Sequence, residues 1–320
     1  MPTQTPPELE AILSDLHAAV TAQPAPAPSR RRRRTPRRLA VALPLLVAVA
    51  AALFVGLGVG NEQPASAARQ LQHAAKLVAA EPAPVIGPGQ YWYVKGLGAF
   101  ANSVATGDGT FTALQTASHE IWIASDASGR IVRNDGPPQF FSAAERTRWE
   151  AAGKPGFGVS GGIDDTEAPG ALSWGIEPLA HRVADIPSDP DALAQLIAQH
   201  SNQNKNPTAQ EEFSLIEQVL RFAPLSGAQT AAFYQVLASL PGIESAGTAK
   251  DGLGRTGTAF TVKHDGLTQE ELILDPATGR LLGSRTTLIA ADPANRDMPV
   301  GAVLGYETIV STGVVGSTDA

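Results

Sequence analysis

The sequence predicts an α+β protein. We expect a single N-terminal transmembrane helix, followed by an extracytoplasmic domain with a curved antiparallel sheet and a group of helices between its strands. Three observations lead to this prediction. An apolar run occupies residues 39–60, alternating strand patterns open and close the rest of the chain, and helical patterns lie in a block between them. Strands and helices in separate blocks, without βα alternation, are typical of α+β folds.

The run from Leu39 to Gly60 predicts the transmembrane helix. Its 22 residues include no charge, amide or hydroxyl group. A helix of that length covers about 33 Å, enough for a hydrocarbon layer of about 30 Å. Arginine at mid-bilayer costs about 3 kcal/mol, so the arginine cluster before the run stays on the cytoplasmic side of the cell membrane. The seven arginines of this membrane flank are Arg30, Arg31, Arg32, Arg33, Arg34, Arg37 and Arg38.

A cleaved signal peptide is the alternative, because Ala65-Ser66-Ala67 has the small-x-small form of a cleavage site. The apolar run is longer than the roughly 7–15 residues of a signal peptide, which favours an uncleaved anchor. The predicted organisation is therefore a cytoplasmic arm (1–38), the membrane helix (39–60), an extracytoplasmic domain (61–311) and a flexible tail (312–320).

Charge is divided between the two sides of the predicted membrane helix. The net charge is −7, and residues 1–60 carry seven arginines against three acidic groups, or +4, which leaves −11 for the remainder. An acidic outer domain argues against nucleic acid as a partner. The chain has no cysteine, which excludes a disulfide framework, a thiolate metal site and a cysteine nucleophile.

A short amphipathic helix is predicted in the cytoplasmic arm over residues 7–20. Thr5-Pro6-Pro7-Glu8 has the form of a capping box, and apolar residues follow at helical spacing. Such a helix needs the membrane surface or a partner for its apolar face, and a sigma factor is one such partner. The alternative is a marginal helix that frays.

The outer domain begins with a helix at 67–80 and an aromatic strand from Tyr91. A Gly/Thr-rich loop then leads to a hairpin whose strands are 119–123 and 130–133. A second hairpin at 271–282 repeats this pattern, either as a duplicated unit or through shared turn chemistry.

The middle of the domain is predicted to be helical. Ser142 begins a capping box, residues 154–175 are irregular, and Pro190 begins a second helix. The expected helices are 143–152, 190–200, 211–222 and 226–240, and the strands after them are 243–248, 257–264, 270–274, 281–288 and 303–311.

Five motifs of the outer domain follow one another along the chain: Gly87-Pro88-Gly89-Gln90-Tyr91-Trp92-Tyr93-Val94, Glu120-Ile121-Trp122-Ile123, Gly129-Arg130, Ile186-Pro187-Ser188-Asp189-Pro190-Asp191-Ala192-Leu193 and Asp275-Pro276-Ala277-Thr278-Gly279-Arg280. Together with the arginine-rich leader and the apolar run, these motifs resemble a family of single-pass actinobacterial envelope proteins, often encoded beside extracytoplasmic-function sigma factors. The resemblance implies membrane topology and envelope residence, and it brings no catalytic residues. More distantly, the outer domain is similar to lipoprotein-carrier (LolA-like) and sigma-regulator (RseB-like) domains, which implies an apolar groove for lipid or lipopeptide.

Catalytic and cofactor motifs find little support in their surroundings. Residues 158–162 fit G-x-S-x-G around Ser160, but the flanks lack the strand and helix that a nucleophile elbow needs. Residues 252–257 fit G-x-G-x-x-G, but a strand pattern follows, so a hairpin loop is the better interpretation. The carboxylates around Asp164-Asp165 and at Glu270-Glu271 are interpreted as solvated surface, and the six histidines lack metal-ligand spacing. No cofactor, metal or catalytic residue is predicted.

Aromatic residues are the best candidates for a ligand groove: Tyr91, Trp92, Tyr93 and Trp122. Core packing is the alternative. The predicted function is a non-catalytic binding or sensing protein of the cell envelope, whose partners are the bilayer and an apolar envelope molecule or another envelope protein. The alternatives are a sigma-factor-linked regulator that acts through residues 7–20 and an envelope hydrolase that uses Ser160.

Overall fold

The computed structural model describes residues 64–107, 109–157, 162–172, 182–201, 208–291 and 298–319. The cytoplasmic arm, the predicted membrane helix and Ser160 lie outside them. Among the helices described, none is long and apolar enough to cross a membrane. The strands are β1 (Tyr91–Thr106), β2 (Gly109–Ala124), β3 (Gly129–Phe140), β4 (Ile163–Glu167), β5 (Glu244–Lys250), β6 (Thr256–His264), β7 (Thr268–Leu274), β8 (Leu281–Leu288) and β9 (Val303–Val315). The helices are α2 (Pro64–Val78), α3 (Ala143–Ala151), the 3₁₀ turn η1 (Val183–Asp185), α4 (Pro190–Ser201), α5 (Ala209–Phe222) and α6 (Gly227–Ser239).

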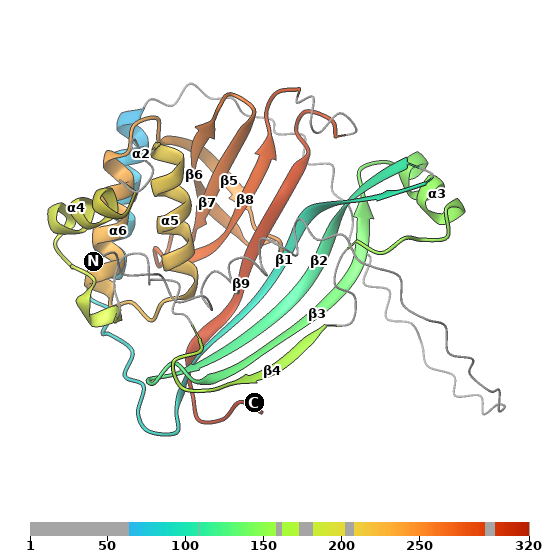
Figure 1. Cartoon of the computed structure of the whole chain (residues 1–320). Coiled ribbons are helices and arrows are strands. Elements are labelled where there is room, and N and C mark those ends of the chain that lie inside the picture. Colours follow the sequence, from blue (N-terminus) through green and yellow to red (C-terminus); the bar gives the residue numbers. More distant parts are fainter. Residues whose placement is uncertain are drawn as a thin grey trace, which may run out of the picture.

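The nine strands of the described residues form one antiparallel sheet in the order β4-β3-β2-β1-β9-β8-β7-β6-β5. The sheet has two edges and does not close. Figure 1 shows it bent, with α2, α4, α5 and α6 grouped against one face at the β5–β8 end and α3 at the far end of the long strands. We call that face the helix face and the opposite one the outer face. The predicted α+β class and the curved antiparallel sheet are confirmed.

Local sequence explains where α5 and α6 begin. Thr208 and Glu211 form a capping box at α5, and Ser226 and Gln229 form another at α6. In each pair, the hydroxyl of the cap residue accepts a hydrogen bond from the backbone N–H three residues later. The side chain of that later residue accepts a hydrogen bond from the backbone N–H of the cap residue. These pairs place the helix starts within two residues of the predictions.

The main core lies between these helices and the sheet. Its largest fully buried side chains include Phe213 of α5, Phe233 and Tyr234 of α6 and Phe260 of β6. Each such aromatic ring stabilises the fold by roughly 1.5–3 kcal/mol through its removal from water. Tyr234 also donates its hydroxyl to the Gly279 carbonyl at 2.8 Å, so its polar atom is satisfied.

A second, smaller core lies beneath α3. Trp149 packs against Phe140 and Phe157, with ring centroids 5.1 and 6.1 Å away, and Phe111 is fully buried beside them. Between the two cores, the helix face of β1 and β2 carries mostly glycine, alanine and polar side chains, together with Phe100. This stretch positions the candidate site.

Three predictions of element boundaries are wrong. The Gly/Thr-rich loop is instead part of the long β1–β2 hairpin, paired from Tyr91 with Ala124 to Thr106 with Gly109. β9 runs past the expected end at Ser311, so residues 312–315 pair with β1 and are not a loose tail. β4 pairs with β3 inside the segment predicted to be irregular. In each case a neighbouring strand stabilises an extended conformation that local propensity does not favour.

The prediction of a hairpin loop at the G-x-G-x-x-G motif is confirmed. Residues 251–255 connect β5 to β6, so the motif at 252–257 leads from this loop into a strand. The two similar hairpins, β2–β3 and β7–β8, share Asx turns: Asp126 accepts the Ser128 N–H at 3.0 Å and Asp275 accepts the Ala277 N–H at 2.8 Å. Shared turn chemistry is one of the two explanations predicted for their likeness, and a duplicated unit would carry the same turns.

Candidate functional site

The four predicted groove residues do not share one surface. Trp92 lies on the helix face, packs against the main core and donates its indole N–H to the Phe222 carbonyl at 2.8 Å. Tyr93 and Trp122 face each other across β1 and β2 on the outer face, with ring centroids 5.1 Å apart. Tyr91 alternates with Trp92 and shares the outer face. The structure therefore brings Tyr93 and Trp122 together on the outer face and places Trp92 on the opposite face.

A cluster of charged side chains occupies the helix face where the helix layer ends. We call it the polar cluster. His119 and Arg133 are paired neighbours on β2 and β3, and Glu217 and Arg221 lie one helical turn apart on α5. Glu307 of β9 completes the cluster: one of its carboxylate oxygens is 3.8 Å from an Arg221 nitrogen, and the other is 3.9 Å from His119 Nδ1.

Two glycines of β1 make room for this cluster. A Cβ atom at Gly96 would lie 2.3 Å from His119 Nε2, and one at Gly98 would lie 2.5 Å from Glu307 Oε1. Real Cβ atoms do not approach other atoms so closely, so the alternation of glycine along β1 lets both side chains lie flat against the sheet.

Burial dominates the electrostatics of the polar cluster. The side chain of Glu307 is only 8% exposed. Its burial raises the pKa of the Glu307 carboxyl, and Arg221 and Arg133 only partly oppose this. Burial, followed by repulsion from Arg221 and Arg133, lowers the pKa of His119 to about 4. His119 is therefore neutral at pH 7, and the net attraction on Glu307 comes from the two arginines.

A pocket of about 180 Å³ adjoins the polar cluster between α5 and the sheet. We call it the α5 pocket. Phe100 and Phe213 supply its aromatic walls, and Phe100 is 38% exposed. Glu270 accepts hydrogen bonds from Gln210 Nε2 at 2.5 Å and from Ser214 Oγ at 2.7 Å, and its burial raises its pKa. The pocket can therefore offer an aromatic contact, carboxylate acceptors and the Arg221 guanidinium within a small volume.

Two larger pockets lie elsewhere on the molecule. One of about 490 Å³ lies among α2, α4 and α6 and is lined by several alanines. Another of about 280 Å³ lies between α2 and strands β6 and β7, with Leu77 and Phe260 inside and Arg69 and His73 around them. Neither brings together buried charged groups as the α5 pocket does.

The carboxylates interpreted as solvated surface behave differently from one another. Asp164 is an exposed partner of Arg130, with two contacts of 2.7 and 2.8 Å. Glu271 is instead buried and pairs with Arg285 at 2.5 Å, and Glu270 is half-buried and accepts a hydrogen bond from Ser214 of α5. The interpretation of Glu270-Glu271 as solvated surface is therefore wrong, because both carboxylates have partners within the fold. Among the residues described, no group of three or more His, Cys, Asp or Glu side chains can hold a metal ion.

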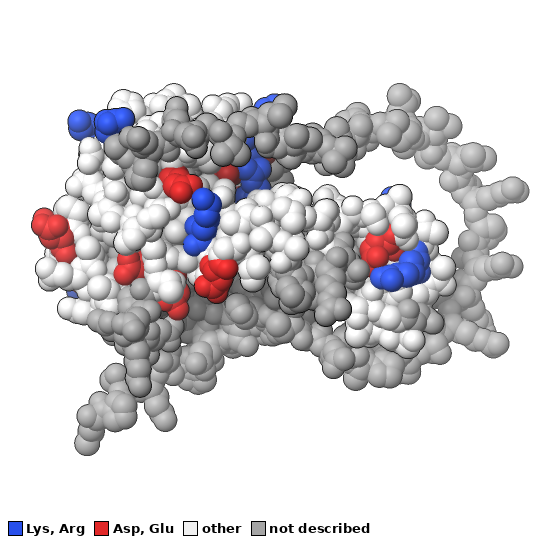
Figure 2. Space-filling view, turned by 90° about the horizontal axis from the view of Figure 1, so that it is seen from above, with Lys and Arg blue, Asp and Glu red and all other residues white. Residues whose placement is uncertain are grey.

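Charge on the surface shows no dominant sign where it can be seen. In the described part of the face in Figure 2, acidic and basic side chains are interspersed, including an opposite-charge group at the α3 end. The described part of this face therefore carries no broad basic patch.

One signal in the sequence indicates the polar cluster. Glu217 and Arg221 lie four residues apart in α5, between apolar residues that the core buries. Charged residues at that spacing beside a buried stripe indicate an ion pair at the edge of a core. His119 and Glu307 carry no comparable signal, because their proximity depends on the strand order.

Comparisons with known proteins were made for the whole chain. No family model and no curated protein matches it. Three solved structures are similar to this chain. The MucA/MucB complex of Pseudomonas aeruginosa is 14% identical with a TM-score of 0.27, and the match covers 79% of this chain and 59% of that chain. MucB in complex with MucA(peri) is 12% identical with a TM-score of 0.26 and coverages of 80% and 58%, and MucB alone is 13% identical with a TM-score of 0.26 and coverages of 79% and 60%.

This chain spans about three fifths of the length of those structures' chains. Similarity at these identities and TM-scores carries no argument about function. The actinobacterial family and the sigma-factor setting therefore stay predictions.

Proposed function

We propose that the chain is a non-catalytic binding or sensing protein of the cell envelope, anchored by its predicted N-terminal membrane helix. In this proposal the α5 pocket and the polar cluster receive the ligand. The observation that carries the proposal is the concentration of buried charge at the one stretch of the helix face that lies between the main core and the α3 core.

Burying these charges is expensive. The penalty for each buried ion is several kcal/mol, and well-packed apolar side chains of similar volume are often as stabilising as a buried ion pair. Glu307 illustrates the cost, because its raised pKa means that its arginine neighbours do not fully offset desolvation. Perturbed groups gathered beside a pocket are typical of ligand sites.

The size of the α5 pocket limits what it binds. Pockets for drug-sized molecules usually measure roughly 300–1,000 Å³, whereas this one measures about 180 Å³. It is therefore suited to a protruding part of a larger envelope molecule, such as a side chain of an envelope protein. Carboxylates and a guanidinium on its walls favour a polar tip, and Phe100 favours an apolar stem.

Photo-crosslinking in bacterial envelopes tests this proposal. The full-length chain would carry a benzophenone amino acid at Phe100 or, as the matched control, at Leu253, an exposed apolar residue (46%) on the β5–β6 turn. We expect a discrete crosslinked species from the Phe100 position only, and we expect Glu307→Gln to reduce its yield several-fold. Equal crosslinking from both positions, or none from Phe100, would count against the proposal.

A further inference from the structure

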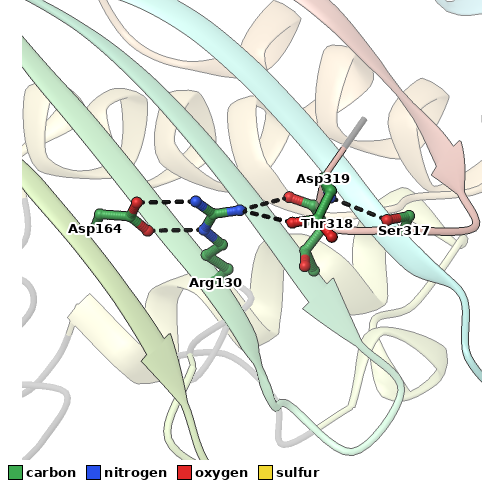
Figure 3. Close-up of polar contacts among 5 residues, drawn as sticks. All are labelled: Arg130, Asp164, Ser317, Thr318 and Asp319. Carbon is green, nitrogen blue, oxygen red and sulfur yellow. Dashed lines mark hydrogen bonds and ion pairs between the residues drawn. The ribbon is translucent and has the colours of Figure 1, made fainter.

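The segment formed by residues 317–319 lies on the outer face, away from the polar cluster. β9 ends at Val315 beside Tyr91 of β1, and Arg130 lies on β3, beyond β1 and β2. Neighbouring strands are about 4.8 Å apart. Residues 316–319 must therefore cross β1 and β2 before they reach Arg130, and Figure 3 shows them doing so.

Arg130 holds this segment as it would hold a bound peptide. Its Nη1 donates to the Thr318 carbonyl at 2.9 Å and to the Asp319 carboxylate at 3.2 Å, while Nε and Nη2 donate to Asp164. Asp164 thus fixes the plane of the guanidinium, and one nitrogen remains for the segment (Figure 3). Within the segment, Ser317 Oγ accepts the Asp319 N–H at 3.0 Å.

An aromatic surface lies in the row that ends at Arg130. Tyr93, Trp122 and Arg130 occupy paired positions on β1, β2 and β3, and the guanidinium lies over the Trp122 ring at 5.7 Å. On β9 the paired position is Gly313, so no side chain fills the space beside Tyr93. We call this row the outer-face strip.

Trp122 is well covered although it lies on the outer face. It is only 3% exposed, and its indole N–H is buried without a hydrogen-bond partner among the described residues. A buried, unpaired N–H is costly, and a peptide carbonyl is the natural acceptor for it. In the free chain the strip therefore combines a guanidinium that contacts residues 317–319 with a buried indole donor that lacks a partner among the described residues.

The segment itself is weakly held. The Asp319 side chain is 87% exposed, and such exposed ion pairs contribute little to stability. Its remaining contact with Arg130 is a single backbone carbonyl. A competing chain that makes the same contacts and also satisfies the indole would displace it.

We propose that the outer-face strip is a binding site for an extended acidic peptide segment of another protein, and that residues 317–319 occupy this site in the free chain. The internal segment acts as a competitor that sets the affinity for the partner. This site lies on the face opposite the polar cluster, so its test is independent of the function proposed above.

Fluorine NMR of the full-length chain labelled with 5-fluorotryptophan tests the proposal. The chain has four tryptophans, and Trp122→Phe identifies the Trp122 signal. The probe is the acetylated, amidated peptide Gly-Ser-Thr-Asp, which copies residues 316–319. In a variant that stops after Gly316, which leaves β9 complete, we expect a saturable shift of the Trp122 signal. At the same peptide concentrations the intact chain should show little shift.

Two further variants separate recognition from misfolding. Arg130→Gln in the shortened chain should weaken peptide binding about tenfold, because a charged hydrogen-bond donor is lost, whereas Arg146→Gln on α3 should bind normally. Asp319→Lys in the intact chain should admit the peptide without any truncation. No Trp122 shift in either the shortened chain or Asp319→Lys, or an equal shift in the unmodified intact chain, would overturn the proposal.

Discussion

His119 shows how a single residue can report on its surroundings. Its ring is largely buried beside Arg221 and Arg133, and these neighbours favour the neutral form. Burial also raises the pKa of Glu307, so removal from water disfavours the charged form of both side chains. The chemistry of the polar cluster is therefore decided by desolvation more than by pairing.

The pH dependence of stability should reveal His119. Its pKa is lowered from 6.5 to about 4 in the folded state, so stability is complete above pH 6.5 and falls as the pH drops towards 4. The loss should reach about 3 kcal/mol, by the conversion of roughly 1.4 kcal/mol per pKa unit. His119→Gln should lack this loss in chemical denaturation at pH 7 and pH 4.5.

The buried glutamates act in the opposite direction. Glu270, Glu271 and Glu307 have raised pKa values, so their contribution to stability is complete at low pH and is lost as the pH rises through the folded pKa. The three glutamates are present in the wild type and in His119→Gln, so the difference in stability between these two proteins at each pH isolates the contribution of the histidine. Identical dependence of stability on pH in the two proteins would contradict the lowered pKa of His119.

At the scale of elements, β1 determines how the sheet serves both faces. Its strict alternation sends Trp92 into the main core and Tyr93 to the outer-face strip, and it places two glycines beneath the polar cluster. The strand also pairs with β2 and β9 along most of its length. A substitution in β1 therefore alters the packing on the face that the substituted residue occupies.

Substitution of Gly98 tests this dependence. An added methyl group would meet the Glu307 carboxylate at 2.5 Å and force it from its place, so we expect Gly98→Ala to destabilise the protein by about 1–3 kcal/mol. Gly313→Ala is the matched control on β9, since nothing lies within 4 Å of its Cβ position; its effect should be neutral or slightly stabilising. Urea unfolding of both variants would show the contrast, and equal midpoints would refute it.

At the scale of the whole molecule, α2 bears on the choice between an anchor and a cleaved leader. The helix begins at Pro64, and Ala67 within it is completely buried in the main core. Cleavage after Ala67 would remove the first turn of α2 and a buried side chain. An uncleaved chain preserves this packing, and the anchor itself stays a prediction.

Fractionation of bacterial cells tests the anchor. We expect the full-length chain to stay in the membrane after alkaline extraction and deletion of residues 39–60 to release it. External protease should degrade the outer domain and spare an epitope placed before Arg30. Mass measurement of the intact chain gives the N-terminus directly, and a chain that begins at Ala68 would show that the leader is cleaved.

The sequence by itself determined the α+β class, the block of helices and most of the turns, because caps, Asx turns and periodicity act over a few neighbouring residues. Ser226 with Gln229 and Asp275 with Ala277 are examples in which the local pattern and the structure agree. Only the tertiary structure decided the full length of the β1–β2 hairpin, the strand at β4 and the end of β9. These depend on pairing with strands that are distant in the chain, which local propensity does not encode.

The candidate sites follow the same division. The importance of Tyr93 and Trp122 was visible in the sequence, but their partner Arg130 and the segment 317–319 meet only because β9, β1, β2 and β3 are neighbours in the sheet. His119 and Glu307 likewise come together through strand order alone. The sequence gives the type of each side chain, whereas packing determines its desolvation and its neighbours. Desolvation and proximity determine the chemistry of both the polar cluster and the outer-face strip.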